Sequence, residues 1–178
     1  MEYLKELEQR IRGILASDVI LSLRELKQLV LSAKDYYEKS RFEQALENAL
    51  KAARGYESRR LDLERAYALN NAARYLDKLF GEENRQGIHE LFMHPYNGVY
   101  TLYAELNETA ANLFVGKTNV NIKTAGYAFY RAALGHALGG NAEKAGENLE
   151  KADKAFELLG RTIDNLRRKV VKMMDKAV

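Results

Sequence analysis

Apolar residues recur every three or four positions along almost the whole of this 178-residue chain, and no segment alternates apolar and polar residues as a strand does. The composition agrees, because Leu and Ala together contribute 48 residues whereas Val and Ile contribute 14. A single proline and 12 glycines are too few for a turn-rich β fold. The sequence therefore predicts an all-α bundle of about seven helices, formed as one domain over residues 1–178.

The sequence lacks cysteine and long apolar runs, and these absences limit the reactions and the cellular locations to be considered. The chain has no cysteine, which excludes disulfides and thiolate chemistry and fits a reducing compartment. No run of 18 apolar residues exists, and the first residues are charged and amphipathic instead of forming a signal peptide. We therefore expect a cytoplasmic protein that does not enter a membrane.

Positive charge gathers at the end of the chain. Residues 161–178 hold six basic and two acidic side chains, so this segment carries +4 although the whole chain carries only +3. Cations are favoured at the C-terminal end of a helix, which is the simplest explanation. The alternative is that the basic C-terminal helix binds nucleic acid, which is a less favoured partner.

The last helix has the most regular apolar spacing. We expect it to begin at Asn141 and to reach Lys176. Its apolar residues follow one another at intervals of three and four: Leu149, Ala152, Phe156, Leu159, Ile163, Leu166, Val170, Met173 and Ala177. The flanking positions lack complementary charges, so this seam is expected to pack within the chain, as one face of a long C-terminal helix.

Two segments of the sequence resemble each other at an offset of 100 residues. Between 41–57 and 141–157, seven of 17 positions are identical without a gap. This similarity predicts two equivalent helical hairpins, over about 20–54 and 123–157. The stretch from Ser40 to Glu43 also matches a capping box, which predicts the start of the second helix of the first hairpin.

At these residues the chain resembles the tetratricopeptide repeat, a helix–turn–helix unit. The first copy places Leu29, Ala33 and Tyr36 before Ala45, Ala49 and Ala52, and the second places Phe129, Ala133 and His136 before Ala145, Leu149 and Ala152. The resemblance implies a protein-interaction module whose groove is lined by the first helix of each repeat. Its groove positions correspond here to Lys27, Val30, Lys34 and Tyr37 in the first copy and to Tyr127, Tyr130 and Leu134 in the second.

A few motifs indicate other chemistry. Arg131 and His136 fit the Arg-x4-to-6-His signature of HEPN-domain ribonucleases, whose histidine would act as acid and base and whose arginine would hold the phosphate. His89 and His94 lie five residues apart, about 140° around a helix, which does not suit a shared metal. Residues 111–118 fit a loosened phosphate-loop pattern, but they continue a helical stripe and no strand precedes them.

These observations together favour a non-enzymatic helical module that binds another protein or a second copy of itself, without a cofactor or a metal. The alternative of a different class is a HEPN-like, metal-independent endoribonuclease that uses Arg131 and His136.

Overall fold

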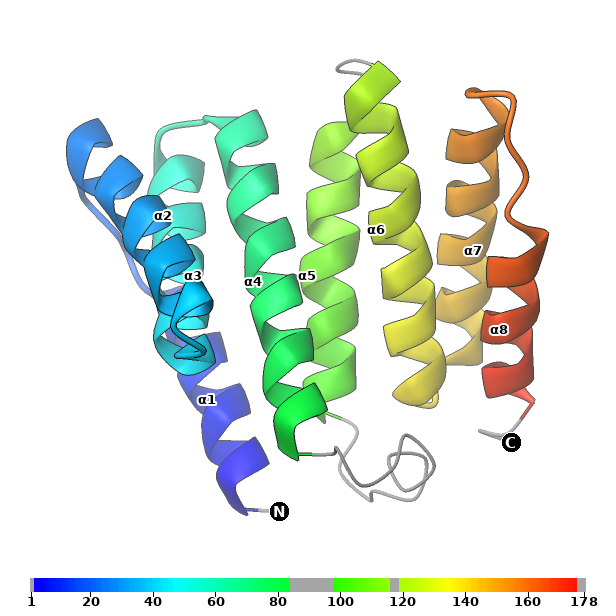
Figure 1. Cartoon of the computed structure of the whole chain (residues 1–178), viewed down its shortest axis with the longest axis horizontal. Helices are drawn as coiled ribbons and strands as arrows, with labels where there is room; N and C mark the ends of the chain where they lie inside the picture. The colour runs from blue at the N-terminus through cyan, green and yellow to red at the C-terminus, as the bar shows by residue number, and fades with distance from the viewer. Residues whose placement is uncertain (1, 84–97, 116–118, 176–178) are drawn as a thin grey trace. The chain divides into compact units, whose positions relative to one another are not determined.

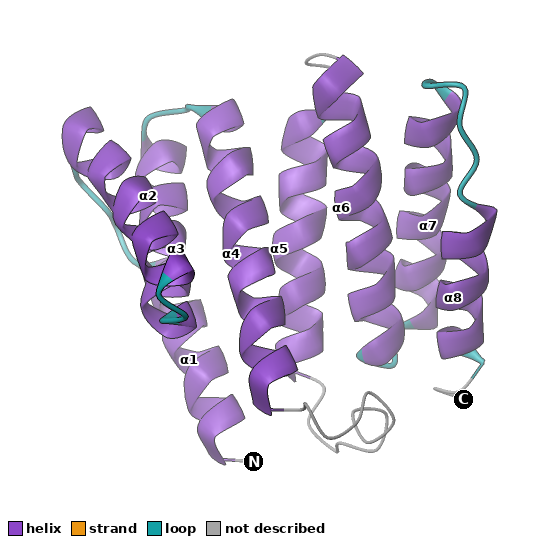
Figure 2. Ribbon diagram, in the orientation of Figure 1, coloured by secondary structure: helices purple, strands orange, loops and turns teal. Residues whose placement is uncertain are grey.

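Eight α-helices and no strand make up the part of the chain that the computed structural model describes, residues 2–83, 98–115 and 119–175 (Figure 2). This confirms the predicted all-α fold, with eight helices instead of about seven. No helix in the described part is both long enough and apolar enough to span a bilayer. The helices are α1 (Glu2–Ala16), α2 (Leu23–Glu38), α3 (Phe42–Ser58), α4 (Asp62–Glu83), α5 (Gly98–Phe114), α6 (Asn119–Leu138), α7 (Ala142–Glu157) and α8 (Asp164–Met174).

The helices form two compact units. The first unit, Met1–Leu91, contains α1 to α4, and the second, Phe92–Val178, contains α5 to α8. The single domain predicted for residues 1–178 stays a prediction.

In the first unit, α3 packs against α1, α2 and α4. Small side chains on several faces of α3 allow this, because they let neighbouring helices approach closely. The buried small residues of α3 are Ala45, Ala49, Ala52, Ala53 and Gly55.

Polar contacts add to the apolar packing between α1 and α3. Leu7 and Ile11 are the buried residues of α1. The carboxylate of Glu43 accepts hydrogen bonds from the Tyr3 hydroxyl, at 2.5 Å, and from Arg10 Nη2, at 2.8 Å. These bonds fix how α1 lies against the start of α3.

In the second unit, α6 packs against α5, α7 and α8, as Figure 1 shows. Both faces of α6 are rich in small buried residues: Ala125, Gly126, Ala128, Ala132, Ala133, Gly135 and Ala137. They let α5 and α7 lie close to it on different sides, so α6 is the central helix of this unit.

The two predicted hairpins are packed helix pairs, α2–α3 and α6–α7. Ala45 and Ala145, at equivalent positions, are both fully buried. Each pair also contains a glycine covered by a large side chain of the other helix. The glycine lies on the second helix of the first pair and on the first helix of the second pair. A Cβ atom on Gly55 of α3 would overlap Leu26 of α2, whereas a Cβ atom on Gly126 of α6 would lie 2.8 Å from the Phe156 ring of α7.

Four helices end in the same way. Each of α2, α3, α6 and α7 ends in a Schellman motif, in which a left-handed residue turns the chain and two amide groups bond back to the last helical turn. The left-handed residues are Ser40, Arg60, Gly140 and Gly160, with φ between 57° and 78°. Ser40 and Gly140 are 100 positions apart, as are Arg60 and Gly160. The repeat therefore includes both the turn inside each hairpin and the turn that follows it.

The structure corrects the capping box predicted from Ser40 to Glu43. Ser40 is the left-handed residue that ends α2, so it cannot begin α3. The capping box of the hairpin lies instead at the start of α2, where the amide of Glu25 donates to Ser22 Oγ at 3.3 Å and the amide of Ser22 donates to Glu25 Oε2 at 2.7 Å.

The structure also corrects the long C-terminal helix predicted from Asn141 to Lys176. Helix α7 ends at Glu157, Gly160 turns the chain with a φ of 63°, and the chain becomes helical again at Asp164, so the segment forms α7 and α8. Phe156, Ile163 and Val170 of the predicted seam are buried, but Leu159 and Leu166 are only half-buried. The apolar spacing is thus satisfied by two helices that share one core.

Candidate functional site

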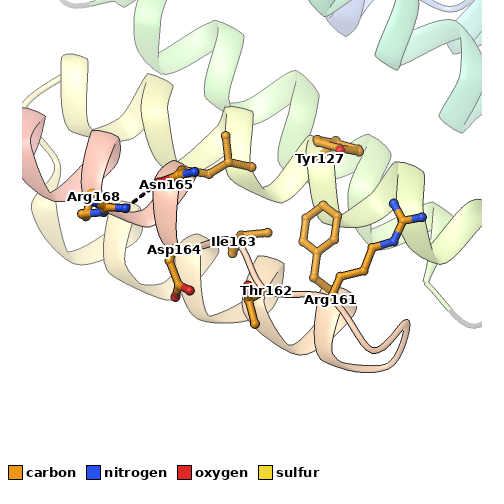
Figure 3. Close-up of a pocket in the computed structure, with 9 residues that line it drawn as sticks. Tyr127, Arg161, Thr162, Ile163, Asp164, Asn165 and Arg168 are labelled. Atoms are coloured by element: carbon orange, nitrogen blue, oxygen red, sulfur yellow. Dashed lines mark hydrogen bonds between the residues drawn. The ribbon is translucent and has the colours of Figure 1, made fainter.

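The break between α7 and α8 opens a pocket in the second unit. Its volume is about 640 Å³, and its walls come from α6, the end of α7, the linker and the start of α8 (Figure 3). The lining residues are Tyr127, Phe156, Arg161, Thr162, Ile163, Asp164, Asn165, Leu166 and Arg168. We call this space the α6–α8 pocket.

One wall of the α6–α8 pocket is aromatic. The rings of Tyr127 and Phe156 meet edge to face, with their centroids 5.0 Å apart and their planes at 82°. Phe156 is only 2% exposed, because its ring lies over Gly126, whereas Tyr127 is 38% exposed. The buried ring of Phe156 therefore supports the accessible ring of Tyr127, which is available to contact a ligand.

The polar part of the α6–α8 pocket is mainly cationic. Arg161 and Arg168 are both exposed, and Asp164 is the single carboxylate among the lining residues. Arg168 Nη2 donates to Asn165 Oδ1 at 2.5 Å, as the dashed line in Figure 3 shows, so this guanidinium has a defined position. The neighbouring Arg167 donates instead to Asp153 of α7 and is not among the lining residues.

The predicted groove residues of the first unit lie on or near the surface of α2. Lys27 and Lys34 are exposed, and Val30 and Tyr37 are half-buried. Lys34 Nζ lies 3.8 Å from Glu38 Oε1. The Tyr37 hydroxyl accepts a hydrogen bond from Arg74 Nη2 of α4 at 3.1 Å, which links α2 to α4.

The predicted groove residues of the second unit differ in accessibility. Tyr127 lines the α6–α8 pocket. Tyr130 is buried, and this burial raises the pKa of its hydroxyl above the ordinary value of 10.0. Leu134 is half-buried. Of these three residues, only Tyr127 lines the α6–α8 pocket.

The histidine of the nuclease signature is packed inside the second unit. His136 is 1% exposed, and Arg131 is half-buried. His136 Nε2 lies 3.3 Å from Glu108 Oε2 of α5, and Lys151 Nζ of α7 donates to Glu108 Oε1 at 3.2 Å. This set joins three helices and gives the buried imidazole of His136 a polar partner.

Two further buried amides lie in the same helices. Asn107 of α5 and Asn148 of α7 are fully buried, and each donates from Nδ2 to the carbonyl oxygen four residues earlier, at 2.9 and 3.0 Å. Their Oδ1 atoms have no hydrogen-bond partner among the described residues. Asn148 is one of the seven positions that are identical in the two copies of the repeat, whereas Asn107 lies on an apolar stripe and belongs to no motif.

The described residues contain no group of three or more His, Cys, Asp or Glu side chains that could hold a metal ion. His89 and His94 lie outside the described residues, as do residues 116–118 of the loosened phosphate-loop pattern. Before them, α5 runs as a helix to Phe114.

Stability should depend on pH through Glu108. Burial alone would raise the pKa of this carboxyl, but the hydrogen bonds and charges of Lys151 and His136 outweigh burial and hold the pKa below its ordinary value of 4.5. A lowered carboxyl pKa stabilises the fold above the pKa of the unfolded chain, and this contribution is lost as the pH falls through the folded pKa. We therefore expect Glu108→Gln to lower the urea midpoint at pH 7 and to have little effect at pH 3. Glu147→Gln, at an exposed position of α7, is the control and should have a small effect at both pH values.

Comparison with known proteins gives no match: no family model, no curated protein and no solved structure is significantly similar to this chain. Its class is therefore defined by the fold alone, as an all-α protein built from packed helix pairs.

Proposed function

We propose that this chain is a non-enzymatic interaction module, similar to a tetratricopeptide repeat, that binds an acidic segment of a protein partner in the α6–α8 pocket. The observation that carries this proposal is the position of Tyr127. The family resemblance selects this residue as a groove position, and it forms the accessible aromatic wall of a pocket with two exposed arginines.

The chemistry of the pocket favours an acidic segment with an apolar or aromatic anchor. Arg161 and Arg168 outnumber the one carboxylate, Asp164, so the pocket attracts negative charge. The anchor side chain packs on Tyr127 in this proposal. Tyrosine and arginine are among the residues that contribute most to the binding free energy of protein interfaces. The groove positions Lys27 and Lys34 add exposed cations to the first unit.

The burial of His136 favours a protein partner over the nuclease alternative. A general acid and base must come within hydrogen-bond reach of its substrate. His136 is 1% exposed and contacts Glu108, whereas the proposed pocket is open and needs no rearrangement of buried residues.

The test uses an array of labelled acidic dodecapeptides, each with one central aromatic residue, and a matched basic array. We expect acidic peptides to bind, and their affinity to fall as salt rises, because exposed charges are screened. The double variant Arg161→Glu, Arg168→Glu should weaken binding at least tenfold.

The control variant Arg24→Glu, Lys78→Glu makes the same change of charge at two exposed positions of the first unit that are not groove positions, and it should leave the affinity within about twofold. The proposal fails if no acidic peptide binds, or if both double variants weaken binding equally. It also fails if a single-stranded oligonucleotide of equal charge binds more tightly than the peptides, because the partner would then be a nucleic acid.

A further inference from the structure

A second pocket lies between α5, α6 and α7 in the second unit, and it shares no residue with the α6–α8 pocket. Its volume is about 440 Å³. Small buried residues form part of the wall, since Ala125 is fully buried and Ala155 is 7% exposed. The apolar lining consists of Val115, Ile122, Ala125, Phe129, Ala155 and Leu158. We call this space the α5–α7 pocket.

Two large apolar side chains of the α5–α7 pocket are unusually accessible. Leu158, at the end of α7, is 76% exposed, and Val115, just after α5, is 54% exposed. Single exposed apolar residues are common on proteins, but here both line the same apolar pocket. An apolar ligand would cover them, which supplies a favourable free energy of binding.

The charged residues of the α5–α7 pocket are both lysines. Lys154 is exposed, and no carboxylate lines the pocket. Lys151 Nζ lies 5.6 Å from the centre of the Phe129 ring and donates to Glu108 Oε1, which holds the ammonium beside the apolar wall. Glu108 is shared between Lys151 and His136, and it does not line the pocket. The pocket thus combines an apolar interior with an excess of positive charge.

We propose that the α5–α7 pocket binds a small amphipathic anion, a free alkyl carboxylate whose chain lies against Phe129 and Leu158 and whose head group meets Lys151 and Lys154. Its volume is within the range of about 300–1,000 Å³ for small-molecule sites, and such sites are mostly apolar with a few placed polar groups. This proposal is independent of the proposed peptide pocket, because the two pockets have no residue in common.

The test measures binding of octanoate and of octan-1-ol to the full chain by titration calorimetry. The two probes have chains of equal length and differ in the charge of the head group. We expect octanoate to bind at one site, and octan-1-ol to bind at least tenfold more weakly. Lys154→Glu should weaken octanoate binding at least tenfold, with an unchanged helical circular dichroism spectrum.

Lys144→Glu is the matched control, because it makes the same change at an exposed position of the same helix. It should leave octanoate binding within about twofold. The proposal is overturned if octanoate does not bind, if octan-1-ol binds equally well, or if Lys154→Glu and Lys144→Glu have equal effects. A further contradicting result would be a dimer by light scattering that octanoate leaves intact and that Leu158→Asp separates, because a second copy of the chain would then cover the pocket.

Discussion

Replacing Phe156 with Ala is expected to lower the free energy of unfolding by about 3–5 kcal/mol, the range for removing a buried aromatic side chain. Phe156 is 2% exposed, and its ring fills the space over Gly126 and supports Tyr127 at a centroid distance of 5.0 Å. No side chain at Gly126 can collapse into the cavity that would remain. The cost should therefore lie toward the upper end of this range.

Urea denaturation followed by circular dichroism checks this prediction. The control is Leu158→Ala, two residues further on and 76% exposed, which should change the stability by less than about 0.5 kcal/mol. Equal losses for the two variants would contradict the packing described here. Phe156→Ala should also weaken binding of acidic peptides, since it removes the ring that supports the accessible wall of the α6–α8 pocket.

The helices could be predicted because apolar spacing reports which face of each helix is covered. The hairpins could be predicted because equivalent small residues, such as Ala45 and Ala145 at an offset of 100, are buried in both packed helix pairs. The spacing could not show the break at Gly160, since Phe156, Ile163 and Val170 remain at intervals of seven and remain buried across it. The break occurs at Gly160, whose φ of 63° is left-handed. A single glycine within a regular apolar stripe is compatible with a helix, so the sequence alone did not predict the break.

The same break limits what could be predicted about the candidate site. The resemblance to a repeat family selected Tyr127, and the structure places it in a pocket. Arg161 and Arg168 could be read from the sequence only as part of the basic segment, because the pocket that they line together with Tyr127 depends on the turn at Gly160. The same resemblance selected Tyr130, and the nuclease signature selected His136. Both are buried, because neither pattern reports which face of α6 is covered by neighbouring helices.

The second large effect is expected at Gly135 of α6, where replacement by Ala should destabilise the protein by about 1–3 kcal/mol. Ala normally stabilises a helix interior relative to Gly by about 0.5–1 kcal/mol. At Gly135, however, a Cβ atom would lie 3.0 Å from the Tyr100 carbonyl oxygen and 3.0 Å from Ala104 Cβ, both of α5. Neither atom can rotate away, so the two helices would have to move apart, and the loss of packing exceeds the gain in helix propensity.

Gly146 of α7 provides the matched control, because it is also a glycine inside a helix of the second unit and a Cβ atom there would meet nothing within 4 Å. Gly146→Ala should therefore stabilise the protein by about 0.5–1 kcal/mol. The two substitutions are chemically identical, so opposite signs in their urea midpoints would isolate the close approach of α5 and α6 as the cause. If both variants were stabilised, α5 would lie further from α6 than the structure places it.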